Sequence, residues 1–357
     1  MLNEVIAHMA GQATPAETEC RRKQFSASCA KVFAVRRLAP PHLLRALLIF
    51  VIAASCLCES RARAQSQDPS ALTAEQTRQE MLQEIEAGDL RNAIPLGERS
   101  VSRWPRDAEL RHYLGIAYFK AGDAKQAKEQ LARAIELNPK DAKTRFDLAL
   151  VWLSEKDYSP AADELIQAVK IDPSNALAHM LLGRAYLNSN RSLQAVEEFK
   201  TTLKLDPAMK LGHYHLGFAY FSLGRNEEAI AEYKEESRIS GENPIVLYEL
   251  GRSLLDAGNY DAAVPSLRRA TELDASNSDA WYNLGKAYGL VAQPAQAEVA
   301  LRKAAELNPK DPSPHYQLAR ILEKLGKTDE AKSERQRFAE LKQAQPAASG
   351  MATGREH

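Results

Sequence analysis

Small and apolar residues recur along most of the chain at a fixed spacing of 34 residues, as from Gly115 to Ala149. One series of glycine and alanine contains Gly115, Ala149, Gly183, Gly217, Gly251, Gly285 and Ala319. A second series, all alanine, contains Ala93, Ala127, Ala161, Ala195, Ala229, Ala263, Ala297 and Ala331. Around them, apolar residues follow the three- and four-residue spacing of an amphipathic α-helix. The pattern predicts a succession of similar helical repeats.

Eight repeats of equal length begin at Ala74, Ala108, Ala142, Ala176, Lys210, Pro244, Ser278 and Pro312. The small residues fall at position 20 of every repeat and at position 8 of every repeat after the first, where they let two helices approach closely. Position 24 is large in six repeats, as Leu131, Leu165, Phe199, Tyr233, Leu267 and Leu301. Proline at position 32 cannot continue a helix and ends five repeats, at Pro105, Pro139, Pro173, Pro207 and Pro309. Because one repeat cannot bury its apolar face alone, we expect neighbours to stack.

This arrangement resembles the tetratricopeptide repeat family, whose signature is a helix–turn–helix of about 34 residues. The resemblance covers residues 74–345 without an insertion. The repeat that begins at Ser278 matches the signature most fully, with Trp281, Leu284, Gly285, Tyr288, Ala297, Leu301, Ala304 and Pro309. The resemblance implies an all-α fold, a right-handed α-solenoid of stacked helix–turn–helix repeats.

The first and last repeats diverge from the pattern, as terminal caps of a repeat array do. The first has Met81 at position 8 and Gly97 at position 24, and the last has Arg335 at position 24. Thr73 and Gln76 have the spacing of a capping box that opens the first helix. Residues 65–73 are predicted to be a linker and residues 346–357 a disordered tail.

One joint between repeats also departs from the pattern. In the repeat that begins at Lys210, position 27 is Glu236 and position 32 is Gly241, and the proline has moved to Pro244. We therefore expect the weakest stacking of the array between this repeat and the next one.

Charge divides the chain, although its 47 Lys and Arg residues balance its 47 Asp and Glu residues. Residues 1–64 contain nine basic and four acidic residues, which leaves 38 basic and 43 acidic residues in 65–357. All four cysteines also lie within 1–64. Because the repeats have no basic surplus, nucleic acid is not an expected partner.

Residues 1–64 are predicted to be a signal peptide or targeting segment. Residues 46–58 form an uncharged apolar run that is shorter than the roughly 20 residues of a membrane-spanning helix. Arg45 precedes this run, and Ala62 and Ala64 occupy the small-residue positions of a cleavage site before Gln65. The predicted location is therefore outside the cytoplasm of a bacterium, in the periplasm or cell envelope.

Other interpretations of this segment remain open. The apolar run could stay uncleaved as a membrane tether, or Cys56 could be the lipidated residue of a lipoprotein. Val35 could be the true start, because it would leave a signal of ordinary length. If cleavage occurs before Gln65, the mature protein has no disulfide, no thiol nucleophile and no cysteine-based metal site.

The first helix of each repeat offers a binding surface, because its positions 2, 5, 9 and 12 share one face turned away from the core. By resemblance to the family, these faces line a concave groove. One part is apolar, with Phe119, Phe146, Leu150, Leu153, Met180, Leu187, Leu211, Phe218 and Phe221. The other has tyrosine at position 5, as Tyr214, Tyr248, Tyr282 and Tyr316, and a cation at position 9, as Arg184, Arg252, Lys286 and Arg320.

These residues predict a groove for an extended peptide or a partner helix. Its apolar part would bury side chains, and its tyrosines and cations would hold carbonyl groups or carboxylates. Alternatively, the tyrosines pack against neighbouring repeats. Arg252 could also be neutralised by Glu249 or Asp256, and Arg320 by Glu323, whereas Arg184 and Lys286 have no acidic residue at these spacings.

No catalytic, cofactor-binding or metal-binding residues are predicted. The sequence contains no HExxH, GxSxG or GxGxxG motif, and Gly326-Lys327-Thr328 lacks the first glycine of a phosphate-binding loop. His179, His213 and His315 all occupy position 4, which favours packing over metal ligation. One variant of the family grips the carboxy-terminal carboxylate of chaperones with Lys at position 5 and Asn at position 9. No repeat here has that pair, so recognition of chaperone tails is not expected.

The sequence therefore predicts a non-catalytic scaffold that binds other proteins, with no cofactor and no small-molecule substrate. Its expected setting is cell-envelope assembly or secretion. One alternative is an accessory subunit that recruits substrates to an envelope hydrolase or transferase. Another is a scaffold that associates with itself through its convex face.

Overall fold

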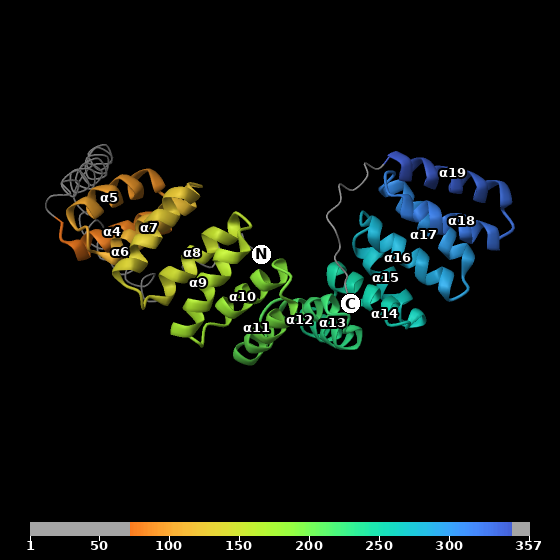
Figure 1. Cartoon of the computed structure of the whole chain (residues 1–357), viewed down its shortest axis with the longest axis horizontal. Helices are drawn as coiled ribbons and strands as arrows, with labels where there is room; N and C mark the ends of the chain where they lie inside the picture. Colours follow the sequence, from red (N-terminus) through yellow and green to blue (C-terminus); the bar gives the residue numbers. More distant parts are fainter. Residues whose placement is uncertain (1–71, 345–357) are drawn as a thin grey trace, which may run out of the picture. The chain divides into compact units, whose positions relative to one another are not determined.

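The computed structural model describes residues 72–344, which form sixteen α-helices and no β-strand (Figure 1). It confirms the predicted all-α solenoid. Within these residues, no helix is both long and apolar enough to cross a membrane. The predicted targeting segment, nearly all of the linker and the predicted tail lie outside the described residues.

Two compact units divide the chain after Ile171. The N-terminal unit contains α4 (Ala74–Ala87), α5 (Leu90–Arg103), α6 (Ala108–Lys120), α7 (Ala124–Leu137), α8 (Ala142–Ser154) and α9 (Tyr158–Ile171). The C-terminal unit contains α10 (Ala176–Asn188), α11 (Ser192–Leu205), α12 (Gly212–Ser222), α13 (Asn226–Ser240), α14 (Pro244–Asp256), α15 (Tyr260–Leu273), α16 (Ser278–Leu290), α17 (Pro294–Leu307), α18 (Pro312–Lys324) and α19 (Thr328–Ala344). Each repeat is thus one helical hairpin.

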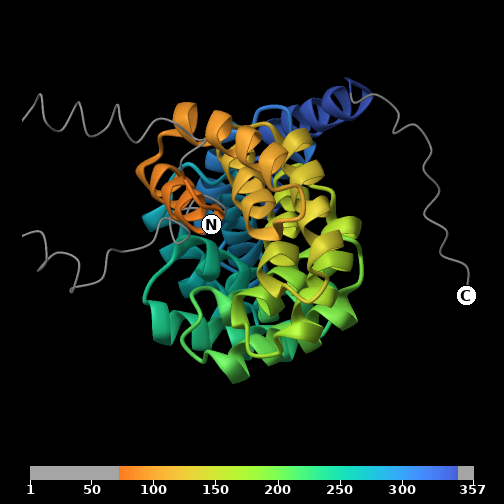
Figure 2. The same cartoon turned by 90° about the vertical axis from the view of Figure 1, so that its left-hand side faces the viewer.

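Each second helix returns beside its first helix, and within a unit it also contacts the first helix of the next repeat (Figures 1 and 2). First helices contact one another as well, for example α14 with α16 and α16 with α18. Second helices of successive repeats have no comparable contact in the described residues. The first helices of a unit therefore form one continuous face, which we call the first-helix face.

Polar caps set the starts of the first helices. The side chains of Asp107, Asn175, Asn277 and Asp311 accept hydrogen bonds from backbone N–H groups of the first turn. The predicted capping box of Thr73 and Gln76 is present at α4. Such caps contribute about 1 kcal/mol each to helix stability.

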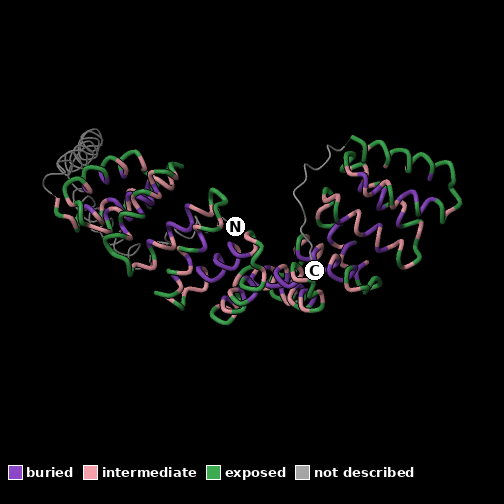
Figure 3. The backbone as a smooth tube through the Cα atoms, in the orientation of Figure 1, coloured by how far each residue is buried: buried purple, intermediate pink, exposed green. Residues whose placement is uncertain are grey.

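The core of each hairpin is built from the small residue at position 8 and the large residue at position 24. A Cβ atom added to Gly251 would lie 2.4 Å from Cγ of Leu267, and one added to Gly183 would lie 2.6 Å from Cε1 of Phe199. The predicted position-24 residues are all completely buried, namely Leu131, Leu165, Phe199, Tyr233, Leu267 and Leu301. Figure 3 shows the buried residues along the sides on which helices meet.

The first and last repeats differ from the others in how they fill positions 8 and 24. In the first, Met81 at position 8 is completely buried and fills the space above Gly97 at position 24. The two residues have exchanged sizes, so this repeat is a mirrored version of the others rather than a degenerate one. In the last, α19 buries only Ala331, as expected for a solvated cap.

The joint at Glu236 is organised by its carboxylate. Glu236 is 2% exposed and accepts hydrogen bonds from the backbone N–H groups of Leu211 (3.3 Å) and Tyr214 (3.2 Å). The hydroxyl of Ser240 donates a third at 2.6 Å. Leu211 has a left-handed backbone, so α12 begins at Gly212, two residues later than Lys210. The expected weak stacking concerns motion and stays a prediction.

Polar pairs link the two helices of most hairpins at positions 4 and 23. His179 binds Glu198 at 2.6 Å, His213 binds Glu232 at 2.7 Å and His315 binds Glu334 at 2.6 Å. Arg145 and Glu164 form the equivalent pair at 2.8 Å. The position-4 histidines therefore have a structural role, which the constant separation between each histidine and its glutamate could have indicated.

His215 is a buried titratable group in the C-terminal unit. Its ring stacks on Phe199 with centroids 5.6 Å apart and meets Tyr214 edge-on at 5.2 Å. Its Nε2 atom has no hydrogen-bond partner among the described residues. Burial, helped by the positive charge of Arg184, lowers the pKa of His215 to about 3. The folded protein therefore keeps this ring neutral.

The turn inside each hairpin contains one residue with a left-handed backbone, which is strained when that residue is not glycine. Position 15 is left-handed throughout, with glycine at Gly122 (φ 85°) and Gly258 (φ 81°) but alanine at Ala292 (φ 59°). We expect Ala292→Gly to raise the free energy of unfolding by about 0.5–1 kcal/mol, because glycine lacks the Cβ penalty there. Urea unfolding would measure it. In the control Ala257→Gly, φ is −80°, so the protein should lose stability; equal effects of both changes would contradict the argument.

The buried histidine makes stability depend on pH. In the unfolded chain its pKa returns to about 6.5, so between pH 6.5 and 3 the unfolded state binds one proton more than the folded state. Stability from this group is therefore complete above pH 6.5 and falls as the pH falls. Relative to His215→Phe, the wild type should lose about 2 kcal/mol between pH 7 and pH 5. Parallel stability profiles of the two proteins would refute this assignment.

Candidate functional site: the first-helix face

The apolar residues predicted for the groove belong to different units and differ in exposure. Phe119, Phe146 and Leu153 lie in the N-terminal unit and are partly exposed. Leu187, Leu211, Phe218 and Phe221 lie in the C-terminal unit and are also partly exposed. Phe119 packs against the cluster around Leu131 and Leu148, so it contributes to the core as well as to the surface.

Two of the predicted groove residues are core residues instead. Leu150 is 2% exposed and Met180 is 3% exposed, so neither can contact a partner on the surface. The same two positions are buried in the repeat of α6, as His112 and Ile116, whereas Tyr316 and Arg320 occupy them exposed in the last repeat. Helical periodicity therefore assigned these two residues to the groove wrongly. It predicts which residues share a face, but not how much of that face a neighbouring element covers.

The tyrosines at position 5 differ along the C-terminal unit. Tyr214, Tyr248 and Tyr282 are half-buried, and burial is the main cause that raises the pKa of each hydroxyl. Tyr282 packs against the core cluster of the last two repeats. Tyr316 is 47% exposed and leans on Phe338 with ring centroids 5.4 Å apart. Most of the series is thus half-buried, and Tyr316 is the most accessible member.

Arg252 is neutralised and packed, as one of the sequence interpretations expected. Its guanidinium lies 3.0 Å from the carboxylate of Glu249. It also lies over the ring of Phe221, 4.0 Å from the centroid, and 5.8 Å from that of Tyr248. Burial raises the pKa of Glu249, and Arg252 opposes that rise. Arg252 of α14 therefore packs against Phe221 of α12 and connects the two helices.

The prediction that Glu323 neutralises Arg320 is wrong. The carboxylate of Glu323 pairs with Arg335 of α19 instead. Arg320 lies 3.5 Å from the amide oxygen of Gln317 and 5.9 Å from the ring centroid of Tyr316. Its charge has no carboxylate partner among residues 72–344, and the same holds for Lys286. Arg184 is half-buried on α10 and makes other interactions.

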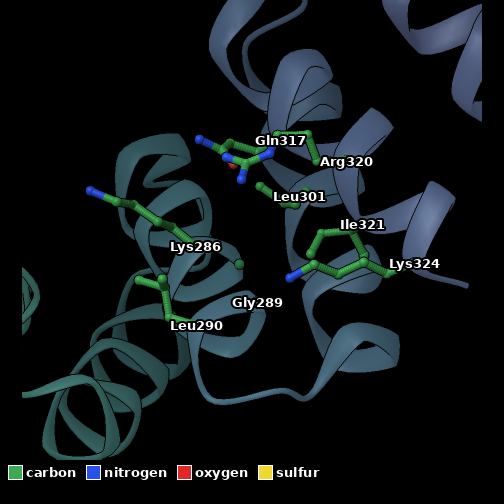
Figure 4. Close-up of a pocket in the computed structure, with 9 residues that line it drawn as sticks. Lys286, Gly289, Leu290, Leu301, Gln317, Arg320, Ile321 and Lys324 are labelled. Atoms are coloured by element: carbon green, nitrogen blue, oxygen red, sulfur yellow. The ribbon is translucent and has the colours of Figure 1, made fainter.

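Lys286 and Arg320 stand at a pocket between α16 and α18 that sequence reasoning missed (Figure 4). Its volume is about 110 Å³, and a third cation, Lys324, lines it. Apolar side chains and two glycines complete the lining, namely Leu290, Leu301, Ile321, Gly285 and Gly289. A signal was available in the sequence, because Gly289 interrupts the large residues at position 12, namely Phe119, Leu153, Leu187, Phe221 and Leu255.

The described residues contain no group of three or more histidine, cysteine or acidic side chains that could hold a metal ion. Gly326 adopts the left-handed backbone of the ordinary hairpin turn, with φ at 77°. The arrangement on the first-helix face is therefore one of aromatic rings and cations, which suits binding of carbonyl groups and carboxylates.

Comparison with known proteins identifies the family. Tetratricopeptide repeat models match residues 84–146, 180–244, 278–311 and 300–333, and a TPR repeat model matches 251–290. No curated protein sequence matches the chain significantly.

Several solved structures are similar to parts of the chain. MamA from Desulfovibrio magneticus RS-1 is 21% identical over 48% of this chain and 97% of its own, with a TM-score of 0.47. YrrB, described as a TPR protein with an unusual peptide-binding site, is 24% identical over 53% and 97%, with a TM-score of 0.47. MamA AMB-1 is 29% identical over 46% and 97%, with a TM-score of 0.43.

One of the repeat matches, over 278–311, coincides with the repeat that begins at Ser278. The chain belongs to the tetratricopeptide repeat family.

Proposed function

We propose that this chain is a non-catalytic scaffold that binds an extended peptide or a helix of a partner protein in a concave groove. The groove corresponds to the first-helix face, and its best-equipped part lies on α16 and α18. The observation that supports this proposal most is the pair of cations Lys286 and Arg320, which no carboxylate neutralises among the described residues.

Several basic residues elsewhere on the surface pair locally with acids. In and next to α13, Arg225 pairs with Glu228 and Arg238 with Glu235. Such exposed pairs add little to stability and leave little charge for a partner. At α16 and α18, by contrast, the charge stands beside the accessible ring of Tyr316. Tyrosine and arginine are the residues that most often dominate the energy of protein interfaces.

The chemistry of this surface favours a peptide. An arginine can hold a carboxylate or a carbonyl oxygen through two parallel hydrogen bonds. A hydrogen bond to a charged group contributes about 1.5–3 kcal/mol, which corresponds to tenfold or more in affinity. A few such bonds and one or two aromatic contacts would suffice for specific binding of a short segment.

The proposed setting is the cell envelope of a bacterium, in assembly or secretion. This part rests on the sequence of residues 1–64, with its basic start, apolar run and small residues before Gln65. A scaffold without cysteines after cleavage needs no disulfide chemistry there, because the hairpin core supplies its stability.

Charge reversal on the face tests the binding proposal. The double variant Lys286→Glu/Arg320→Glu should recover its partner from envelope extracts at least tenfold less well than the wild type, because it repels the groups that the cations attract. Quantitative mass spectrometry of the captured proteins would measure this.

The matched control carries the same charge change away from the face. Lys310 lies in a turn and Lys332 on α19, both exposed, so Lys310→Glu/Lys332→Glu should bind normally. Both double variants should melt near the wild-type temperature. Equal recovery of partners by all three proteins would count against the first-helix face as the binding surface.

The export proposal makes a separate prediction. Mass spectrometry of the protein purified from bacterial envelopes should show a mature chain that begins at Gln65 and contains no cysteine. A lipid-modified chain that begins at Cys56 would show instead that the protein is processed as a lipoprotein. A chain that keeps the apolar run 46–58 would show that this run stays uncleaved as a membrane tether.

A further inference from the structure

We infer that the pocket between α16 and α18 is a carboxylate-binding subsite, which makes the chain select a partner segment that carries an acidic group. This inference rests on the proposed function and specifies the chemistry of its partner.

Three cations line one small pocket. Lys286 comes from α16, and Arg320 and Lys324 come from α18, one helical turn apart (Figure 4). None of the three has a carboxylate partner among residues 72–344. Like charges around one pocket repel one another, so an anion that enters the pocket lowers the electrostatic energy.

Two acidic residues of α17 and α18 form ion pairs with cations outside the pocket. Glu323 on α18 pairs with Arg335 of α19. Glu298 on α17 pairs with Arg302 and with Lys327, both at 2.8 Å. Neither carboxylate therefore pairs with a cation of the pocket.

Gly289 creates the space for an anion. Position 12 carries a large apolar side chain in most other repeats, and glycine replaces it only in the repeat of α16 within the described residues. A Cβ atom at this position would lie 2.9 Å from Cδ1 of Ile321, so even an alanine would narrow the opening. The pocket is thus a local departure from the repeat pattern.

The size and walls of the pocket suit a carboxylate side chain. Its volume of about 110 Å³ is well below the roughly 300–1,000 Å³ of pockets for small-molecule ligands. Leu290, Leu301 and Ile321 form apolar walls, which lower the local dielectric constant and strengthen the attraction between cation and anion. Gln317 can add a neutral hydrogen-bond donor.

The remaining sequence favours a peptide over a nucleic acid as the source of the anion. Residues 65–357 contain 38 basic and 43 acidic residues, so a long polyanion would meet repulsion outside the pocket. One or a few carboxylates on a short segment would not. The carboxylate could be an acidic side chain or a chain terminus, since both offer the same two oxygens.

Three synthetic probes separate these sources: amidated hexaglutamate, amidated hexaglutamine, and hexaglutamine with a free carboxyl terminus. NMR titrations of the purified protein at low salt would measure their binding. We expect hexaglutamate to bind and amidated hexaglutamine not to bind. Binding of the free-terminus probe alone would assign the pocket to a chain end, and binding of neither acidic probe would overturn the inference.

Pocket variants distinguish this site from general attraction. Gly289→Leu fills the space and keeps every charge, so it should weaken hexaglutamate binding at least tenfold. Leucine is the better helix former, and Ile321 can shift at its flexible end, so the fold should survive. Lys324→Gln should weaken binding as well, and Lys332→Gln on exposed α19 is the control. Unchanged binding by Gly289→Leu and Lys324→Gln would refute the subsite.

The result is independent of the partner experiment. If the charge-reversed double variant loses its partner but hexaglutamate binds all pocket variants equally, the scaffold function stands and the carboxylate subsite falls. If hexaglutamate binding depends on Gly289 and Lys324 but no partner depends on the first-helix face, the subsite stands and the proposed function falls.

Discussion

The structure depends on the close approach of two helices inside every repeat. A glycine or alanine at position 8 leaves room that the large residue at position 24 fills, as Gly251 does for Leu267. The contact is so tight that a Cβ atom would overlap the partner side chain, so the helices cannot shift without opening a void. The first repeat shows that the volume matters and not its direction, because Met81 and Gly97 exchange sizes and close the same gap.

Because the contact between positions 8 and 24 holds each hairpin together, the outer positions of the first helices are available for other uses. Positions 5, 9 and 12 contribute less to the hairpin core, so they vary from repeat to repeat. Some are nevertheless recruited into stacking, as Tyr282 and Arg252 are, and these connect repeats rather than contact a partner. On α16 and α18, Gly289 stands where other repeats have a large side chain, and the carboxylate of Glu323 pairs with Arg335 of α19. The proposed binding surface therefore includes a local departure from the repeat pattern.

Polar groups inside the array show the same division between local and long-range causes. The pairs between positions 4 and 23 lie within one hairpin, and their constant spacing is visible in the sequence once the hairpin is known. The carboxylate of Glu236 is different, because it looks like a defect at an alanine position. It in fact accepts backbone hydrogen bonds at the start of α12, and such acceptors stabilise an otherwise unsatisfied helix terminus. Only the folded joint brings the donors within reach.

The sequence by itself determined the fold, the length and register of the repeats, and the small and large core positions, since all of these depend on spacings within one or two helices. For Arg252 it offered Glu249 and Asp256 as partners, and the structure selects Glu249. The tertiary structure alone decided that Leu150 and Met180 are buried, that Glu323 binds Arg335 rather than Arg320, and that Gly289 opens a pocket between three cations. The physical reason is distance. A helical period predicts which residues share a face, whereas burial and charge neutralisation depend on which element from elsewhere in the chain comes to lie against that face.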